Sequence, residues 1–389
     1  ATCKHVLLAP LPKIPYSMDL MTRRITFVLL LLSHSLTLIG ADIHLILRNG
    51  NVIDGSGRAS FKADIAISHD GRIERIAKNI SASAAQEIEL AGLTVTPGFI
   101  DVHTHAENIT RYPGATNFLR MGVTTLVLGN CGTSKIDIRS FFKDLQDSRI
   151  SPNIATLIGH NSIRLNSMKG SFMRPPTAKE LARMESLVEQ AMRDGAIGLS
   201  TGLIYLPGTF AKTDELIALA KAAGQHDGIY VSHMRSEGDS ILKAIDELLK
   251  IAATAGVPAH VSHIKASGRK NWNRSTDILA TLDAARDRGL LITQDQYEYT
   301  ASSTGISAII PQQYRSGTRA DFRKRIADPE TKATIVAHLK RHLKARDEPD
   351  YGYAVIASWS KDRSLNGLRL PAAAQQHLGS DSLDSQIDL

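Results

Sequence analysis

The sequence predicts an α/β protein whose main part is a (β/α)8 barrel of the TIM type. After Gly98, short apolar runs alternate with helical patterns at intervals of roughly thirty residues, as expected for parallel strands joined by helices. Seven such runs are present in the 389-residue chain. The number and spacing of these repeats favour a barrel over a doubly wound sheet. The region contains neither a Gly-x-Gly-x-x-Gly motif nor a P-loop, so nucleotide binding has no support.

The strands of the barrel are predicted from apolar runs bounded by turn residues. These runs are Phe99–Val102, Val123–Leu128, Ile154–Ile158, Ala196–Ser200, Ile229–Ser232, Ala259–Ser262 and Leu291–Gln294. Three helices between them are predicted from apolar residues at helical spacing, and they are Ala178–Arg193, Thr213–Ala223 and Ser240–Ala255. Residues 98–389 are therefore assigned to the barrel.

Residues 42–97 show a different pattern, typical of a small antiparallel β unit. Asn49-Gly50 is expected to form a turn that ends a first strand at Arg48. Two further short runs, Glu87–Leu90 and Leu93–Thr96, are expected to complete the unit.

The N-terminus resembles a targeting segment. Met18 and Met21 are candidate starts, so residues 1–17 are predicted to be an upstream extension. Arg23 and Arg24 precede an apolar run that is followed by the small Ala41, which predicts a signal peptide over residues 18–41. We therefore expect a periplasmic or secreted protein without stable membrane association after cleavage. If the N-terminus is misassigned, the protein is cytoplasmic, and a retained membrane anchor is a further alternative.

Charge and cysteine content limit the classes of partner. The net charge is +7, but the basic residues are scattered, and only 5% of the residues are aromatic. This composition argues against nucleic-acid binding, which needs basic patches and stacking platforms.

Cys3 falls in the predicted extension, which leaves Cys131 without a partner for a disulfide. Cys131 is then a buried apolar residue, a reactive thiol or a metal ligand.

Five candidate metal ligands follow predicted barrel strands. His103 and His105 end the first strand, and residues two apart on a strand point to the same side. Cys131, His233 and His263 follow the second, fifth and sixth strands. Because barrel enzymes build their sites at the carboxyl ends of the strands, these side chains are expected to converge.

Imidazole and thiolate are ligands that suit Zn²⁺. Five ligands exceed one tetrahedral site, which predicts two zinc sites or one bridging thiolate. His260 is separated from His263 by an odd number of residues, so we expect it to face the helices and to be structural.

Polar residues with suitable reach lie beside these ligands. Tyr205 follows the fourth strand and is a candidate donor to an oxyanion. Arg235 and Lys265 each lie two residues beyond a histidine, where each is either a partner for an anionic substrate group or an exposed cation. Tyr299 and Ser303 belong to a polar loop after the seventh strand that is a candidate wall of the substrate site.

Several segments together resemble the N-acyl-D-amino-acid deacylase (D-aminoacylase) branch of the metal-dependent amidohydrolase superfamily. The resemblance covers roughly residues 43–380. Its segments are Thr96-Pro97-Gly98-Phe99-Ile100-Asp101-Val102-His103-Thr104-His105, Gly129-Asn130-Cys131-Gly132, Gly198-Leu199-Ser200-Thr201-Gly202-Leu203-Ile204-Tyr205, Ser232-His233-Met234-Arg235-Ser236-Glu237 and Ser262-His263-Ile264-Lys265. The Cys131 segment is the most specific to this branch, which uses a cysteine where many relatives use a carboxylated lysine.

The resemblance implies hydrolysis of the amide bond of N-acyl-D-amino acids, with release of a carboxylate and a D-amino acid. It implies a tight zinc site at Cys131, His233 and His263. A second, weaker site would use His103 and His105 with the same sulfur. Tyr205 would hold the carbonyl oxygen and Lys265 would meet the substrate carboxylate.

The sequence departs from the family at its C-terminal end. The catalytic aspartate of the family follows the eighth strand, and no matching segment is found before Leu389. We therefore expect a barrel truncated before strand 8, a small N-terminal β-sandwich segment without its C-terminal strands, and part of an inserted subdomain near residues 310–389. Asp362 would substitute only if Tyr353–Ser358 formed the eighth strand.

Catalysis is accordingly expected to be impaired in this chain. The alternatives are a cyclic amidase or dipeptidase of the same superfamily, and a non-catalytic, zinc-binding remnant.

Overall fold

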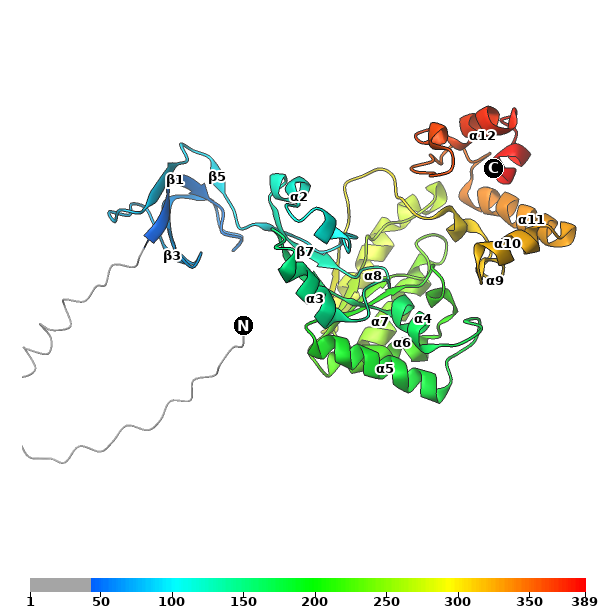
Figure 1. Cartoon of the computed structure of the whole chain (residues 1–389), viewed down its shortest axis with the longest axis horizontal. Coiled ribbons are helices and arrows are strands. Elements are labelled where there is room, and N and C mark those ends of the chain that lie inside the picture. Colours follow the sequence, from blue (N-terminus) through cyan, green and yellow to red (C-terminus); the bar gives the residue numbers. More distant parts are fainter. Residues whose placement is uncertain (1–42) are drawn as a thin grey trace, which may run out of the picture. The chain divides into compact units, whose positions relative to one another are not determined.

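The computed structural model describes residues 43–389, so the predicted extension (1–17) and signal peptide (18–41) lie outside the described residues. The chain divides into two compact units between Pro97 and Gly98. Figure 1 shows both units and labels many of their elements. Among the described residues, no helix combines the length and the apolar character that crossing a membrane requires.

The first unit contains one five-stranded mixed sheet. Its strands are β1 (Ile43–Val52), β2 (Phe61–Ser68), β3 (Ile73–Ala77), β4 (Gln86–Glu89) and β5 (Thr94–Val95). β1 pairs antiparallel with β2, but it pairs parallel with β4 and β5. The expectation of a purely antiparallel unit was therefore wrong, because the chain returns after β3 to the free edge of β1 and runs along it in the same direction.

The Asn49-Gly50 pair does not end a strand, which corrects a second expectation. β1 continues through both residues, and the register to β2 shifts between Leu47 and Gly50. Asn49 has a left-handed backbone (φ 56°), and its N–H donates to Oδ1 of Asp64 at 2.9 Å. The pair therefore forms a bulge whose unpaired N–H is satisfied by a carboxylate of the neighbouring strand.

The second unit is built on parallel strands in sequence order. They are β6 (Phe99–Asp101), β7 (Val123–Leu128), β8 (Asn153–Thr156), β9 (Ile158–Gly159), β10 (Gly198–Gly202), β11 (Ile229–His233), β12 (Ala259–Val261) and β13 (Ile292–Gln294). β6, β7 and β8 form one sheet, and β9 to β13 form another. Leu157 separates β8 from β9, but its N–H donates to the carbonyl of Leu128 at 2.9 Å, so the two sheets adjoin. The predicted α/β class with parallel strands is confirmed.

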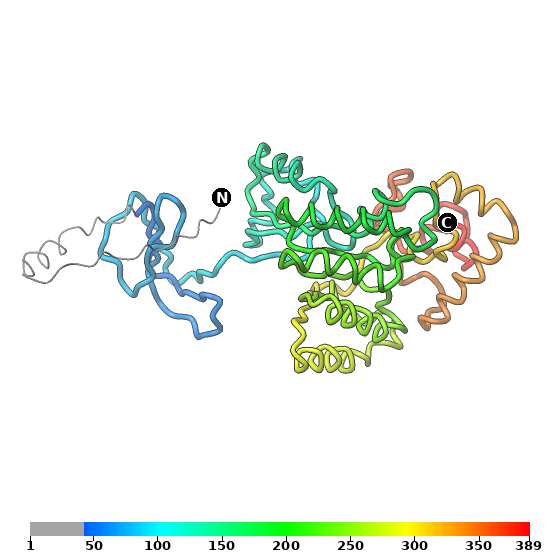
Figure 2. The backbone as a smooth tube through the Cα atoms, turned by 90° about the horizontal axis from the view of Figure 1, so that it is seen from below, coloured from blue at the N-terminus to red at the C-terminus, as the bar shows by residue number. Residues whose placement is uncertain are grey.

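Helices follow the strands. They are α2 (Thr116–Arg120), α3 (Ile138–Asp147), α4 (His160–Ser167), α5 (Ala178–Arg193), α6 (Thr213–Gly224), α7 (Ile241–Ala255) and α8 (Ser275–Asp287). α4 to α8 pack each against the next, as Figures 1 and 2 show. The main core contains Met184, Leu216 and Leu248 of the helices together with Leu199 and Val261 of the strands. This burial of one apolar face per helix holds the strands in register.

The first and last of these strands, β6 and β13, are not paired with each other among residues 43–389. Apolar side chains on them are exposed, namely Phe99, Ile100 and the adjoining Leu291. Their carboxyl ends nevertheless meet, because Nδ1 of His103 lies 3.2 Å from Oδ2 of Asp295. The strand pairing thus establishes parallel neighbours from β6 to β8 and from β9 to β13, and it leaves the closed barrel as a proposal.

The residues after β13 form a helical segment with its own small core. The helices are α9 (Gln312–Arg315), α10 (Arg319–Ile326), α11 (Pro329–Arg346), α12 (Leu370–Leu378) and α13 (Leu383–Asp388). Leu339, Leu343 and Tyr351 are buried among them. Tyr353–Ser358 contributes only an isolated bridge from Val355 to Arg369, so it is not an eighth strand.

Candidate metal centre

Four of the five predicted ligands converge at the carboxyl ends of β6, β7, β11 and β12. The Sγ atom of Cys131 lies 3.4 Å from Nε2 of His103. It lies 3.7 Å from Nδ1 of His233 and 3.7 Å from Nε2 of His263. Three different imidazoles thus present a ring nitrogen to one sulfur.

Two of these ligands stand on left-handed backbone. Cys131 has φ 54° and His263 has φ 37°, which are uncommon values for residues with a Cβ. Strain of this kind is found at functional sites, where the surrounding structure holds it in place. Here the main chain of Cys131 is closely covered, because a Cβ added to Gly202 would stand 2.1 Å from its carbonyl oxygen. The backbones of the Gly-x-Cys-Gly and Thr-Gly segments therefore lie so close together that Gly132 and Gly202 leave no room for a side chain.

Burial determines the charge state of the centre. It raises the pKa of the Cys131 thiol to about 12, and the carboxylates of Asp295 and Glu237 act in the same direction. Burial also lowers the pKa of His233 to about 3, so its imidazole is neutral. A neutral imidazole is the form that binds a metal, and a buried thiol ionises when a cation is available to hold it. The imidazole and thiol donors and their convergence on one point fit zinc.

The fifth predicted ligand, His105, lies at the margin of this group. Its ring centroid is 5.4 Å from that of His103, and its side chain is exposed. Within the described chain, His103, Cys131 and His263 offer ligand atoms within 4.8 Å of one another, and His105 is outside that set. The structure thus places His105 beside the centre without bringing it into the cluster.

Asp295 belongs to the centre and was not among the sequence-predicted residues. It directly follows β13, and its Oδ1 accepts a hydrogen bond from the N–H of His263 at 2.7 Å. Its Oδ2 lies 3.2 Å from Nδ1 of His103 and 2.7 Å from Nε2 of His260. Burial acts to raise the pKa of Asp295, but these histidines outweigh it and the pKa is lowered. The strand-end rule that identified the histidines would have identified Asp295 if it had been applied to carboxylates.

His260 does not face the helices, which corrects the expectation. Its neighbours Ala259 and Val261 belong to the core shared with the helices, so His260 lies on the other face of the sheet. The argument from odd spacing failed because β12 ends at Val261 and the chain then turns at His263. Strand alternation does not extend through such a turn.

Glu237 is the second residue that sequence reasoning missed. One of its carboxylate oxygens, Oε1, lies 2.8 Å from Nδ1 of His263 and 2.6 Å from Nζ of Lys265. Glu237 also forms, with His233 and His263, a second group whose ligand atoms lie within 4.8 Å of one another. It lies four residues after His233, in the segment that predicted the ligand, and its acidic side chain was the available signal.

The predicted substrate residues have different surroundings. The ring of Tyr205 lies 4.8 Å from that of His233, and its hydroxyl lies 3.2 Å from Oγ1 of Thr304. Lys265 is held by Glu237 as described above. The side chains of Tyr299 and Ser303 are exposed. Tyr205 and Lys265 are thus adjacent to the centre, whereas Tyr299 and Ser303 lie on the surface of the loop.

Arg235 is partly buried and is engaged with other residues of the chain, and its expected role toward an anionic group of the substrate stays a prediction. Its Nε and Nη2 donate to the carboxylate of Glu247 at 2.9 and 3.0 Å. Its remaining hydrogen bonds go to the carbonyls of Thr209 and Ala211. The guanidinium therefore ties the loop after β11 to α7 and to the segment before α6.

Asp362, the alternative catalytic carboxylate, caps a short helical turn in the C-terminal segment. It accepts hydrogen bonds from the backbone and hydroxyl of Ser364, and it faces His377. Asp362 therefore has a structural role, because a carboxylate that precedes a helical turn accepts a hydrogen bond from a backbone N–H that has no partner within the turn.

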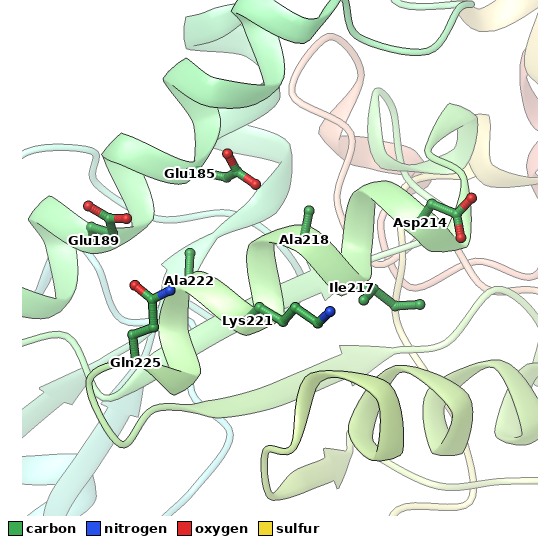
Figure 3. A pocket seen from close by; sticks show the side chains of 8 residues that line it. All are labelled: Glu185, Glu189, Asp214, Ile217, Ala218, Lys221, Ala222 and Gln225. Carbon is green, nitrogen blue, oxygen red and sulfur yellow. The ribbon is translucent and has the colours of Figure 1, made fainter.

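A hollow of about 430 Å³ lies elsewhere, between α5 and α6. Figure 3 shows the side chains around it, including Glu185 and Glu189 of α5 and Asp214 and Lys221 of α6. None of the candidate ligands lines it. This groove between two helices is therefore separate from the candidate metal centre.

Comparison with known proteins agrees with this geometry. The model of the amidohydrolase family matches residues 86–320. D-aminoacylase of Alcaligenes xylosoxydans xylosoxydans is 37% identical over 284 residues, which are 67% of this chain and 58% of that protein. N-acyl-D-glutamate deacylase of the same organism is 34% identical over 285 residues, with the same shares. The chain thus spans 58% of the length of these curated relatives.

Solved structures extend the likeness to three dimensions. N-acyl-D-glutamate deacylase from Bordetella bronchiseptica, complexed with zinc and a phosphonate inhibitor, matches with a TM-score of 0.74 at 28% identity. The match covers 89% of this chain and 69% of that one. A D-aminoacylase studied for its binuclear metal centre gives a TM-score of 0.71 at 28% identity, covering 89% and 70% of the two chains.

The chain therefore belongs to the amidohydrolase family. Within that family it is similar to D-aminoacylase and to N-acyl-D-glutamate deacylase, so the predicted resemblance to this branch is confirmed.

Proposed function

We propose that this protein is a zinc-dependent hydrolase of N-acyl-D-amino acids that releases a carboxylate and a D-amino acid. The observation that carries the proposal is the approach of three imidazole nitrogens to within 3.4–3.7 Å of the buried Cys131 sulfur. The names of the similar proteins support the same substrate class, because they are deacylases of D-amino acids and of D-glutamate.

The residues of the centre have separate roles in this proposal. Cys131, His233 and His263 hold one zinc tightly, and His103 and His105 offer a second, weaker site that shares the sulfur. When bound, zinc lowers the pKa of water and polarises an amide carbonyl.

Two side chains beside the centre orient the substrate. The hydroxyl of Tyr205 donates a hydrogen bond to the carbonyl oxygen of the amide, since its ring already packs beside the His233 ring. The ammonium of Lys265 pairs with the substrate carboxylate while it also donates a hydrogen bond to Glu237.

The architecture and cellular location belong to the same proposal. We propose that the parallel strands form the greater part of a (β/α)8 barrel, and that the first unit belongs to a small β-sandwich. We also propose that the protein is exported through the segment 18–41.

The proposal is tested on the purified full chain by two measurements. Zinc content per chain should approach one or two equivalents, and acetate should be released from N-acetyl-D-methionine faster than from its L-enantiomer. Absence of zinc with all five ligands intact contradicts the proposal. Bound zinc without acetate release supports the non-catalytic remnant, and a preference for hydantoins or dipeptides in the same assay overturns the substrate assignment.

A further inference from the structure

One carboxylate oxygen, Oε1 of Glu237, faces a metal ligand and a substrate residue at once. It lies 2.8 Å from Nδ1 of His263 and 2.6 Å from Nζ of Lys265. The loop that carries Glu237 is itself held, because its carbonyl accepts a hydrogen bond from the N–H of Ser267 at 2.7 Å. Glu237 is therefore fixed between the segments that follow β11 and β12.

The two ring nitrogens of His263 point in different directions. Nε2 lies 3.7 Å from Sγ of Cys131, whereas Nδ1 faces Glu237. An imidazole that offers Nε2 to a metal carries its proton on Nδ1, and the partner of that proton fixes the tautomer and the orientation of the ring. A carboxylate is the acceptor that this arrangement needs.

We propose that Glu237 is a positioning residue that orients His263 toward the metal and holds Lys265 beside it. This inference rests on the proposed function, in that the centre binds zinc. The ammonium of Lys265 donates to Oε1 at 2.6 Å and also lies 3.0 Å from Nδ1 of His263, so the lysine is kept next to the ligand it flanks.

Glu237 could instead be a ligand, because with His233 and His263 it forms a compact group of donor atoms. The contacts argue against this role. Oε1 already accepts a hydrogen bond from the Lys265 ammonium at 2.6 Å and lies 2.8 Å from Nδ1 of His263. A metal ion at this oxygen would have to displace Lys265 and would meet its positive charge at close range.

The same arrangement recurs at a second ligand. His103 directs Nε2 to the Cys131 sulfur at 3.4 Å, and its Nδ1 lies 3.2 Å from Oδ2 of Asp295. Two imidazoles on different strands thus share one pattern, with a carboxylate on one nitrogen and the sulfur on the other. The repetition favours positioning as the role of such carboxylates in this centre.

The test is zinc affinity of the full chain, measured by competition with a chromophoric chelator. Glu237→Ala should lower the affinity of the tight site about 10–100-fold, which is the usual effect of removing such a partner. Glu237→Gln keeps an oxygen acceptor and should lower it less. With cobalt in place of zinc, the sulfur-to-metal charge-transfer band should persist in both variants, since Cys131 remains a ligand.

The matched control is Asp239→Asn. Asp239 lies in the same loop and also pairs with a lysine, Lys270, at 2.7 Å, but it contacts no candidate ligand. Its variant should bind zinc with the affinity of the unsubstituted chain, and circular dichroism should show that all variants are folded.

Three outcomes overturn the proposal. Affinity within twofold of the unsubstituted chain in Glu237→Ala means that Glu237 does not position His263. If Glu237→Ala binds one zinc ion fewer per chain and the remaining zinc is bound with unchanged affinity, Glu237 is a metal ligand. If Asp239→Asn loses as much zinc affinity as Glu237→Ala does, the effect comes from the folding of the loop and not from the contact with His263. Absence of zinc in the unsubstituted chain is seen before any variant is made, and it refutes the proposed function itself.

Discussion

The Sγ atom of Cys131 lies 3.4 Å from Nε2 of His103, although 28 positions separate the two residues. The contact exists because β6 and β7 are neighbouring parallel strands, and parallel strands bring their carboxyl ends to one edge. Cys131 itself has a left-handed backbone, with φ 54°. The following predictions depend on this relationship and on the buried contacts around it.

Replacing Cys131 by alanine should remove most of the bound zinc. The sulfur is the one atom that all three imidazoles approach, so its loss affects every predicted site. We expect the affinity to fall by more than about 100-fold, beyond the loss typical of outer partners. Equilibrium dialysis with zinc measures this loss. His260→Ala is the control, since His260 reaches the centre only through Asp295, and an equal loss in both variants would refute the shared role of the sulfur.

Replacing Gly202 by alanine should also impair zinc binding. The added Cβ would lie 2.1 Å from the carbonyl oxygen of Cys131, so the backbone under the ligand must move. A change of this kind, forced into a packed site, typically costs about 1–3 kcal/mol of stability. Zinc content and the urea midpoint measure the two effects. Gly114→Ala is the matched control because its Cβ meets nothing closer than 3.7 Å, and equal behaviour of the two variants would contradict the prediction.

Replacing Glu215 by glutamine should destabilise the second unit strongly. Glu215 is buried and accepts from Arg164 at 2.5 and 2.7 Å, and its Oε1 lies 2.8 Å from Nε2 of the buried His160. Removing its charge leaves Arg164 buried without a counterion, which typically costs about 3–5 kcal/mol. The free energy of unfolding in urea measures this. Asp147→Asn breaks an exposed pair with Lys143 and should change stability by less than about 1 kcal/mol.

The same carboxylate predicts how stability changes in acid. Burial acts to raise the pKa of Glu215, but His160 and Arg164 outweigh it and hold the pKa below its ordinary value of 4.5. The unfolded chain therefore binds this proton at a higher pH than the folded chain does. The contribution of Glu215 is present above pH 4.5 and is lost as the pH falls through its folded-state pKa. Urea unfolding at several pH values should show the unsubstituted chain and Glu215→Gln converging in acid, and a constant difference would contradict the assignment.

Local patterns predicted the elements of the second unit closely. The run Val123–Leu128 coincides with β7, and Ala178–Arg193 coincides with α5. The start of α5 is coded by neighbours in sequence, because Thr177 and Glu180 form a reciprocal capping box. The positions of His103, Cys131, His233 and His263 followed from one rule about strand ends, and the structure brings those four together.

Long-range pairing was not predictable in the same way. The parallel course of β4 along β1 depends on how the chain returns across more than thirty residues. The partners of Arg235, Glu237 and Asp295 depend on which loops meet above the strands, and no spacing along the chain encodes that meeting. His260 shows the same limit, because a turn at His263 interrupted the alternation on which its expected orientation was based.

The sequence by itself determined the succession of strands and helices, and with it the edge at which imidazoles and a thiol must collect. Both depend on hydrophobic periodicity and chain direction, which are properties of neighbouring residues. The tertiary structure alone decided which carboxylate holds which imidazole and which ring nitrogen faces the sulfur. Those choices depend on burial and hydrogen bonds between segments far apart in the chain, and these form only when the strands are packed side by side.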